Sequence, residues 1–227
     1  DGRDSEAEDS WANMVDTMWV KWQATDALAV KIGDYGIAWA NDLVIDDGIG
    51  GTGTIGLMYA IEDVADLAFY LSRDDEAGED DITTMGVTVE GEMGPVEAGL
   101  MYLQTTDDIT DDSNYGLIDV YGNFGVGPVA IALEYGQQSA DWDDEDGGSI
   151  LLAEFGLEDL VGFGLNIGMV QTNEEWAGAF YSDDFDRAKI YDAEETDQMM
   201  VFLGAEYGVN DRWSVGCLLY TSDAADE

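Results

Sequence analysis

The side chains able to do chemistry in this chain are almost all carboxylates. Its 227 residues include 51 Asp and Glu against 7 Lys and Arg, with no His and a single Cys. Without His, the chain has no Ser-His or Cys-His catalytic pair and no His metal site. One Cys allows neither a zinc–thiolate site nor an internal disulfide. Acid pairs such as Glu174-Glu175 could serve as general acid and base, but they lie within uniformly acidic segments. We therefore expect no enzymatic activity and no cofactor.

Runs of acids are also potential ligands for Ca²⁺ or Mg²⁺, because hard cations bind several carboxylate oxygens. The residues of such runs that could collect cations weakly are Asp74, Asp75, Glu76, Asp143 and Asp144. No run combines the Asp spacing and the sixth-position Gly of an EF-hand loop, so no specific metal site is predicted. The alternative is a solvated anionic rim, as in an adaptation to high salt. The net charge of −44 argues against nucleic-acid binding, which depends on Lys and Arg.

The acids must be kept apart from a large apolar fraction, since 46% of the residues are hydrophobic. A period-2 alternation does this. In Val161–Met169 every second residue is large and apolar, and the others are Gly162, Gly164, Asn166 and Gly168. Such alternation indicates strands with two different faces. Twelve strands are predicted, over residues 14–23, 28–39, 53–61, 66–72, 83–91, 95–105, 115–124, 128–138, 149–157, 161–171, 198–207 and 212–216.

The connections between these strands alternate between short turns and long polar segments, and more than half of the acids lie in the long segments or before the first strand. Tilted strands of about 9–11 residues cross a bilayer, whereas the average strand has about 5–6. The pattern predicts an all-β, antiparallel up-and-down transmembrane β-barrel, with a soluble β-sandwich or barrel as the alternative. Two aromatic belts are expected. Tyr70, Tyr102, Tyr115 and Tyr135 would lie near the long connections, and Phe124, Phe163, Tyr207 and Trp213 near the short turns.

The same alternation sorts charged side chains onto the face opposite the apolar one. An ionised Lys or Arg at mid-depth on the lipid face would cost about 2–4 kcal/mol, so charged residues are expected to face a lumen. The predicted pore-lining residues are Lys21, Lys31, Glu90, Glu97, Asp119, Glu134, Glu154, Asn166 and Glu206. A path lined mainly by carboxylates would favour cations. The alternative is that each is a solvated wall residue without a role in selectivity.

One local passage resembles a known family. Trp19-Val20-Lys21-Trp22, a turn, and Leu28-Ala29-Val30-Lys31-Ile32-Gly33 resemble the strand pair that precedes the inward-folded constriction loop of Gram-negative general porins. The resemblance implies that residues 41–48 occupy the constriction-loop position, with Asp42, Asp46 and Asp47 as its candidate residues. It also implies an outer-membrane location, small hydrophilic solutes, outer-membrane lipid as a partner, and a homotrimer. The chain departs from the family pattern in having almost no Arg in the strands that should face this loop.

Three segments are expected: an acidic loop or fragment end over residues 1–13, a barrel domain over 14–216, and a tail over 217–227. The tail resembles the translation of an adapter used in sequencing libraries and is predicted to be non-native. The barrel is expected to lack strands at both ends. Two functions stay open: a cation-preferring diffusion channel, and a structural or adhesive acidic β-protein of the cell surface that binds cations or partners through its loops. A channel needs small and polar inward residues, whereas a plugged barrel needs bulky ones.

Overall fold

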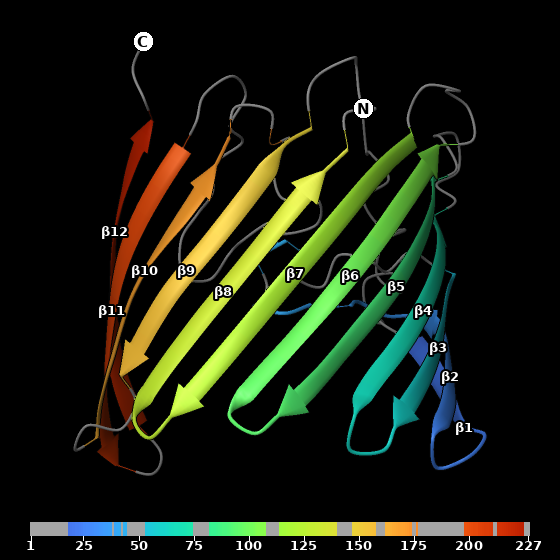
Figure 1. The fold of residues 1–227 in the computed structure, drawn as a ribbon, viewed down its shortest axis with the longest axis horizontal. Coiled ribbons are helices and arrows are strands. Elements are labelled where there is room, and N and C mark those ends of the chain that lie inside the picture. The colour runs from blue at the N-terminus through green and yellow to red at the C-terminus, as the bar shows by residue number, and fades with distance from the viewer. Residues whose placement is uncertain are drawn as a thin grey trace, which may run out of the picture.

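The computed structural model forms one curved sheet (Figure 1). It describes residues 18–37, 39–41, 43–44, 53–74, 82–107, 114–139, 147–157, 162–173, 176, 198–210 and 213–224. The strands are β1 (Met18–Gln23), β2 (Leu28–Asp34), β3 (Thr54–Ile61), β4 (Ala65–Asp74), β5 (Ile82–Met93), β6 (Val96–Asp107), β7 (Asn114–Val126), β8 (Val129–Gln138), β9 (Ser149–Leu157), β10 (Phe163–Thr172), β11 (Gln198–Asn210) and β12 (Trp213–Ala224). Neighbours in the chain pair antiparallel from β1 to β12, which confirms the predicted all-β meander. Within the described residues, no helix is long and apolar enough to cross a membrane.

The short turns lie together along one edge of the sheet, at the bottom of Figure 1. Two of them are two-residue turns, Gly94-Pro95 and Gly127-Pro128. Their glycines have φ values of 63° and 60°, a region that Gly enters at little cost and that suits tight hairpins. Each Pro is the second turn residue, so the strand begins one position later than predicted.

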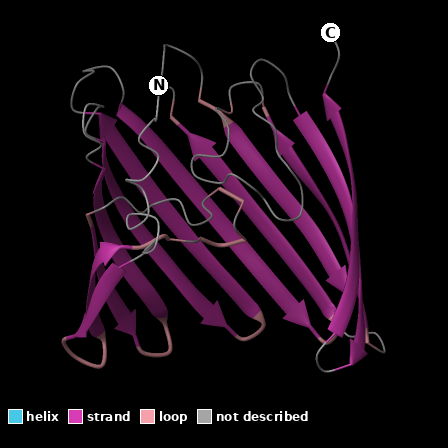
Figure 2. Ribbon diagram, turned by 180° about the vertical axis from the view of Figure 1, so that it is seen from behind, coloured by secondary structure: helices cyan, strands magenta, loops and turns pink. Residues whose placement is uncertain are grey.

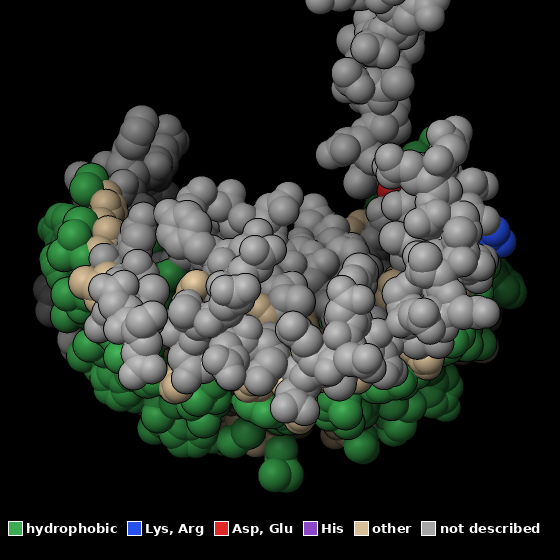
Figure 3. All heavy atoms as spheres, turned by 90° about the horizontal axis from the view of Figure 1, so that it is seen from above, with side chains coloured by type: hydrophobic (Ala, Val, Ile, Leu, Met, Phe, Trp, Pro, Cys, Tyr) green, Lys and Arg blue, Asp and Glu red, His purple; other side chains and the backbone are tan. Residues whose placement is uncertain are grey.

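The convex face of the sheet is apolar (Figure 3). Exposed large apolar side chains occur on every strand from β1 to β12. On β8, Leu133 is 52% exposed whereas the next residue, Glu134, is 1% exposed, so the two faces divide as predicted. On β10, Ile167 is exposed in the same way, while Val161 lies outside the described residues. A soluble monomer rarely exposes so continuous an apolar surface. The convex face matches the lipid-facing side of a membrane barrel.

Of the eight aromatic residues predicted to form belts, five face outward, one does not, and the side chains of two lie outside the described residues. Outward-facing, exposed rings are those of Tyr102, Tyr135, Phe124, Phe163 and Tyr207; the side chains of Tyr115 and Trp213 lie outside the described residues. Tyr70 instead packs on the concave face. Tyr70 and Ser72 are two positions apart on β4, so their side chains lie on the same face. Ser72 is buried, and its Oγ lies 3.0 Å from Thr54 Oγ1 on β3. A Tyr on that parity cannot reach lipid, so its assignment to a belt was wrong.

Two predicted strand ends were also wrong. β2 ends at Asp34 and not at residue 39, because the chain leaves the sheet after Gly33, whose φ is 138° and where a Cβ would collide with Met18. β12 continues to Ala224 because β11 offers partners along its whole length. This pairing does not decide the origin of residues 217–227, and their non-native origin stays a prediction. Among the described strands, β1 and β12 each pair on one side only, so the sheet is open.

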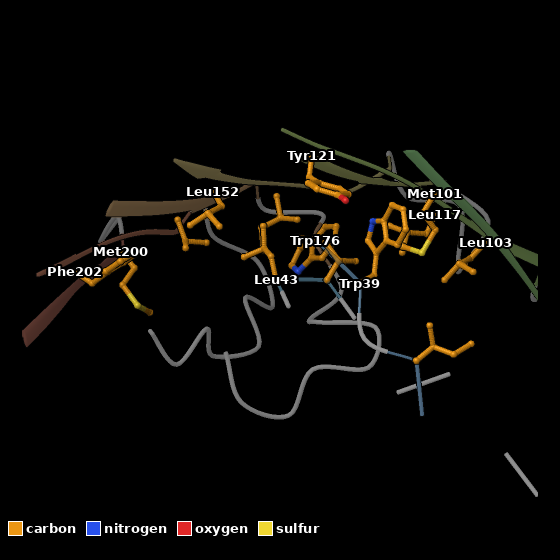
Figure 4. Packing of buried hydrophobic residues seen from close by; sticks show 14 of the residues in the cluster. Trp39, Leu43, Met101, Leu103, Leu117, Tyr121, Leu152, Trp176, Met200 and Phe202 are labelled. Atoms are coloured by element: carbon orange, nitrogen blue, oxygen red, sulfur yellow. The ribbon is translucent and has the colours of Figure 1, made fainter. Parts of the chain in front are cut away.

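The core of the molecule lies on the concave face (Figure 4). We call it the concave cluster. It contains Met101, Leu103, Leu117, Tyr121, Ile150, Leu152, Val170, Met200 and Phe202 from the strands, Tyr35, Ile37, Trp39, Leu43 and Val44 from the segment after β2, and Trp176 after β10. Met200 and Phe202 share the inward parity of Glu206 on the same strand, so the alternation along the chain places these two bulky residues inward. At the other positions of the concave cluster, apolar residues occur on both faces of the strand. The polar–apolar alternation is interrupted there, so it does not show that these side chains are buried.

Candidate functional site

The segment that follows β2 turns inward and lies against the concave face. We call residues 35–44 the inward segment; the structure describes all of them except 38 and 42. Figure 2 looks into the concave side and shows loop segments crossing in front of the strands. Tyr35, Trp39 and Leu43 are buried there. The inward segment thus begins before the residues that the porin resemblance assigned to a constriction loop and includes the first of them.

Two acids of the wall hold the inward segment by hydrogen bonds. The indole Nε1–H of Trp39 donates to Asp119 Oδ1 on β7 at 2.9 Å. The backbone N–H of Asn41 donates to Glu134 Oε2 on β8, also at 2.9 Å. Asp119 is 0% exposed, and a buried carboxylate is costly unless donors reach it. These two predicted pore-lining residues therefore lie beneath the inward segment.

Glycines of the wall make room for the same segment. A Cβ at Gly56 on β3 would meet the hydroxyl of Tyr35, and one at Gly136 on β8 would meet Val44. At Gly99 on β6 it would meet the rings of Trp39 and Tyr121. Those two rings pack edge to face, with centroids 5.3 Å apart and an interplanar angle of 86°. An inward Gly therefore does not by itself mark open space, because these three are contact points.

Tyr35, the first residue of the inward segment, contacts the charged side chain of Lys31 on β2. Lys31 Nζ on β2 lies 3.7 Å from the ring centroid of Tyr35 and 4.5 Å from that of Trp19 on β1. Such contacts attract a cation to the ring face. Burial, and secondarily the nearby Tyr70, raises the pKa of Tyr35 to about 12, so its phenol stays neutral at ordinary pH. Lys21, the cross-strand partner of Lys31, is exposed.

Toward the short turns the concave face is open. A hollow of about 1010 Å³ lies there, lined by the acids Glu92, Glu97, Glu154 and Glu206 and the amides Asn41, Asn123 and Asn166. Its floor consists largely of small residues, including Ala130, Ala132, Gly156, Gly164 and Gly204. Among the described residues that line it there is no Lys or Arg. This arrangement offers space and negative charge to a solute.

Hydrogen bonds orient some of these acids. Asn166 Nδ2 donates to Glu154 Oε1 at 3.1 Å. The Tyr121 hydroxyl lies 3.1 Å from Glu97 Oε1 and 3.3 Å from Glu90 Oε2, and its single proton can serve only one of them at a time. Tyr121 belongs to the concave cluster, so it links the filled and the open parts of the concave face.

A second buried tryptophan comes from the connection after β10. Trp176 is 1% exposed and belongs to the concave cluster, and Figure 4 shows it near Leu43 and Trp39. Its backbone N–H donates to Asn173 O, and Asn173 Oδ1 in turn accepts from the N–H of Ser149 at the start of β9. Sequence analysis missed Trp176. The feature that could have indicated its burial is an aromatic residue directly after two acids, in an otherwise polar connection.

All nine predicted pore-lining residues lie on strands with the parity of the concave face: Lys21, Lys31, Glu90, Glu97, Asp119, Glu134, Glu154, Asn166 and Glu206. Their role in a pore stays a prediction. Sequence analysis missed Glu92, although it shares the parity of Glu90. The constriction candidates Asp42, Asp46 and Asp47 and the cation candidates Asp75, Glu76, Asp143 and Asp144 lie outside the described residues, as does the side chain of Asp74. No group of three or more acids among the described residues could hold a metal ion.

Comparison with known families gives one match. A family model for Gram-negative porins matches residues 2–224, which is nearly the whole chain. No curated protein matches the chain in sequence.

Solved structures of outer-membrane channels share the fold. Pseudomonas aeruginosa OccK3 (OpdO) matches with a TM-score of 0.61 and 11% identity, over 92% of this chain and 64% of that one. P. aeruginosa OccD3 (OpdP) has a TM-score of 0.58 and 10% identity, over 91% and 63%. Acinetobacter baumannii OccAB4 has a TM-score of 0.56 and 12% identity, over 89% and 59%. The chain therefore spans less than two thirds of the length of each of these structures.

Proposed function

The chain belongs to the family of Gram-negative porins, proteins of the outer membrane, and on this premise we propose that the full-length protein forms a water-filled diffusion channel that prefers cations. Its solutes are small and hydrophilic, since acids and amides line the hollow of the concave face. The homotrimer implied by the porin resemblance stays a prediction, to be tested by the mass of the purified protein in detergent.

The lining of the hollow is the observation that carries the ion preference. Glu92, Glu97 and Glu206 are exposed to it and Glu154 is half-buried. Among the described residues, the cationic side chains with the parity of the concave face are Lys21 on β1 and Lys31 on β2, and neither lines the hollow. Fixed carboxylates without opposing cations raise the local concentration of cations and lower that of anions.

Reversal potentials across a KCl gradient, measured on the full-length protein in planar bilayers, test this proposal. We expect K⁺ to be favoured over Cl⁻ in dilute salt. The preference should weaken as salt rises, because the screening length is roughly 10 Å at 0.1 M and shrinks further above it. An anion-preferring or salt-indifferent pore would show that the acids only solvate the surface. A folded protein without conductance would favour the structural or adhesive alternative.

A further inference from the structure

We infer that the acids of the concave face divide into two groups with different roles. Asp119 and Glu134 are positioning residues that hold the inward segment against the wall. Glu92, Glu97, Glu154 and Glu206 act directly on permeating ions. The inference rests on the proposed channel and refines it, because it removes Asp119 and Glu134 from the residues that set ion preference.

Burial separates the two groups. Asp119 and Glu134 are almost completely buried, and neither lines the hollow. The acids of the second group all line it and retain exposed surface. A solute in the hollow therefore meets the second group and not the first. A buried acid acts on the pore through whatever it holds in place.

The hydrogen bonds identify what the buried acids hold. Trp39 donates to Asp119 and Asn41 donates to Glu134, so the two contacts flank Ala40. The φ of Ala40 is 55°, a conformation that residues with a Cβ adopt only where the surroundings impose it. The two acids thus fix a bend of the inward segment from both sides. The position of this bend determines how far the inward segment stands away from the wall.

To hold the inward segment, an acid needs only an oxygen that accepts a hydrogen bond. To set ion preference, it needs its negative charge, so the two roles can be separated by mutation. Glu134→Gln keeps an oxygen that can accept from the Asn41 N–H and loses the charge, whereas Glu134→Ala loses both. We expect the Gln variant to keep the wild-type single-channel conductance and K⁺/Cl⁻ permeability ratio. The Ala variant should lose the steady conductance level and gain open-channel noise. Asp119→Asn and Asp119→Ala form a second such pair.

Glu154 supplies the matched control, because it is also a strand glutamate of the concave face but lines the hollow. Glu154→Gln and Glu154→Ala should lower the K⁺/Cl⁻ permeability ratio by the same factor, since both remove the charge. If Glu134→Gln lowers this ratio as much as Glu154→Gln does, the inference is overturned. This comparison uses only Gln variants, so it decides the matter even if the Ala variants fail to fold.

A second measurement does not depend on channel activity. Chymotrypsin cleaves after aromatic residues, and Tyr35 and Trp39 are protected by burial. In lipid vesicles, Glu134→Ala should become cleavable at these residues while Glu134→Gln stays protected like the wild type. Equal protection of folded Ala and Gln variants would contradict the positioning role. A wild-type channel without cation preference would contradict the proposed function, yet the contrast in proteolysis would still be measurable.

Discussion

The part of the concave face near the long connections and the part near the short turns are built on the same strands but contain different things. The first is filled by the concave cluster and the inward segment. The second holds a hollow of about 1010 Å³ lined by acids and amides. β7 contributes to both, with buried Leu117 and Asp119 in the filled part and Asn123 lining the hollow. Strand geometry is therefore the same in both parts, and side-chain size and partners make the difference.

This comparison shows that facing inward has two physical meanings. An inward acid in the filled part is desolvated and must accept hydrogen bonds from protein, as Glu134 does. An inward acid in the hollow keeps contact with solvent, as Glu206 does. An inward Gly likewise either receives a side chain, as at Gly99, or leaves space, as at Gly164. The expected effects of mutation differ accordingly.

The largest difference should follow from truncating the central ring of the filled part. Trp39→Ala removes a buried indole that packs on Tyr121 and bonds Asp119, and losses of this kind cost about 3–5 kcal/mol of unfolding free energy. Urea unfolding in lipid vesicles measures it. Glu206→Ala, in the hollow, is the control and should change the unfolding free energy little. Equal losses in the two variants would contradict the division of the concave face.

A smaller difference is expected from adding one methyl group to each part. Gly99→Ala would press against Tyr121 and Trp39, and such overpacking costs about 1–3 kcal/mol. Gly164→Ala has its nearest atoms at 3.9 and 4.0 Å, so its change should stay within about 0.5 kcal/mol. The same urea assay compares them. If Gly164→Ala were as harmful as Gly99→Ala, the hollow would not be open space.

Neutralising the hollow should change ion preference without changing stability. We expect Glu97, Glu154 and Glu206 replaced together by Gln to lower the K⁺/Cl⁻ permeability ratio strongly in dilute KCl, with Glu92 as the remaining acid among the described lining residues. The difference from the wild type should fade at 1 M salt, where the screening length is about 3 Å. Asn123→Ala, a neutral lining residue, is the control in the reversal-potential measurement. An unchanged ratio in the triple variant would place the selectivity elsewhere in the pore.

The smallest effect is expected from the acidic connection between β4 and β5. Replacing Asp75, Glu76, Glu79, Asp80 and Asp81 by Asn or Gln should lower K⁺ conductance at low salt only, because charges of a polar connection are expected to act through a field that salt screens. The permeability ratio should change less than in the triple variant of the hollow. Conductance measured against salt concentration checks this prediction, and an equal loss at high salt would contradict it.

Most of the fold could be predicted from the sequence, because the signal of a strand is local. Side chains two positions apart share a face, so the alternation through Val129–Tyr135 was enough to place Leu133 outward and Glu134 inward. The same parity applies to Glu92, which was overlooked although Glu90 was identified. The alternation of short turns and long connections predicted that each strand pairs with the next one in the chain, because two antiparallel strands can be joined by a tight turn.

The contents of the concave face were decided only by the tertiary structure. Trp39 and Asp119 are 80 positions apart in the chain, and Asn41 and Glu134 are 93 apart. No local period links such residues, so the sequence could not distinguish a desolvated acid from one that lines a hollow. The alternation determined which way each side chain points. Whether it then meets the inward segment or open space depends on which distant residues the curvature of the sheet brings against it.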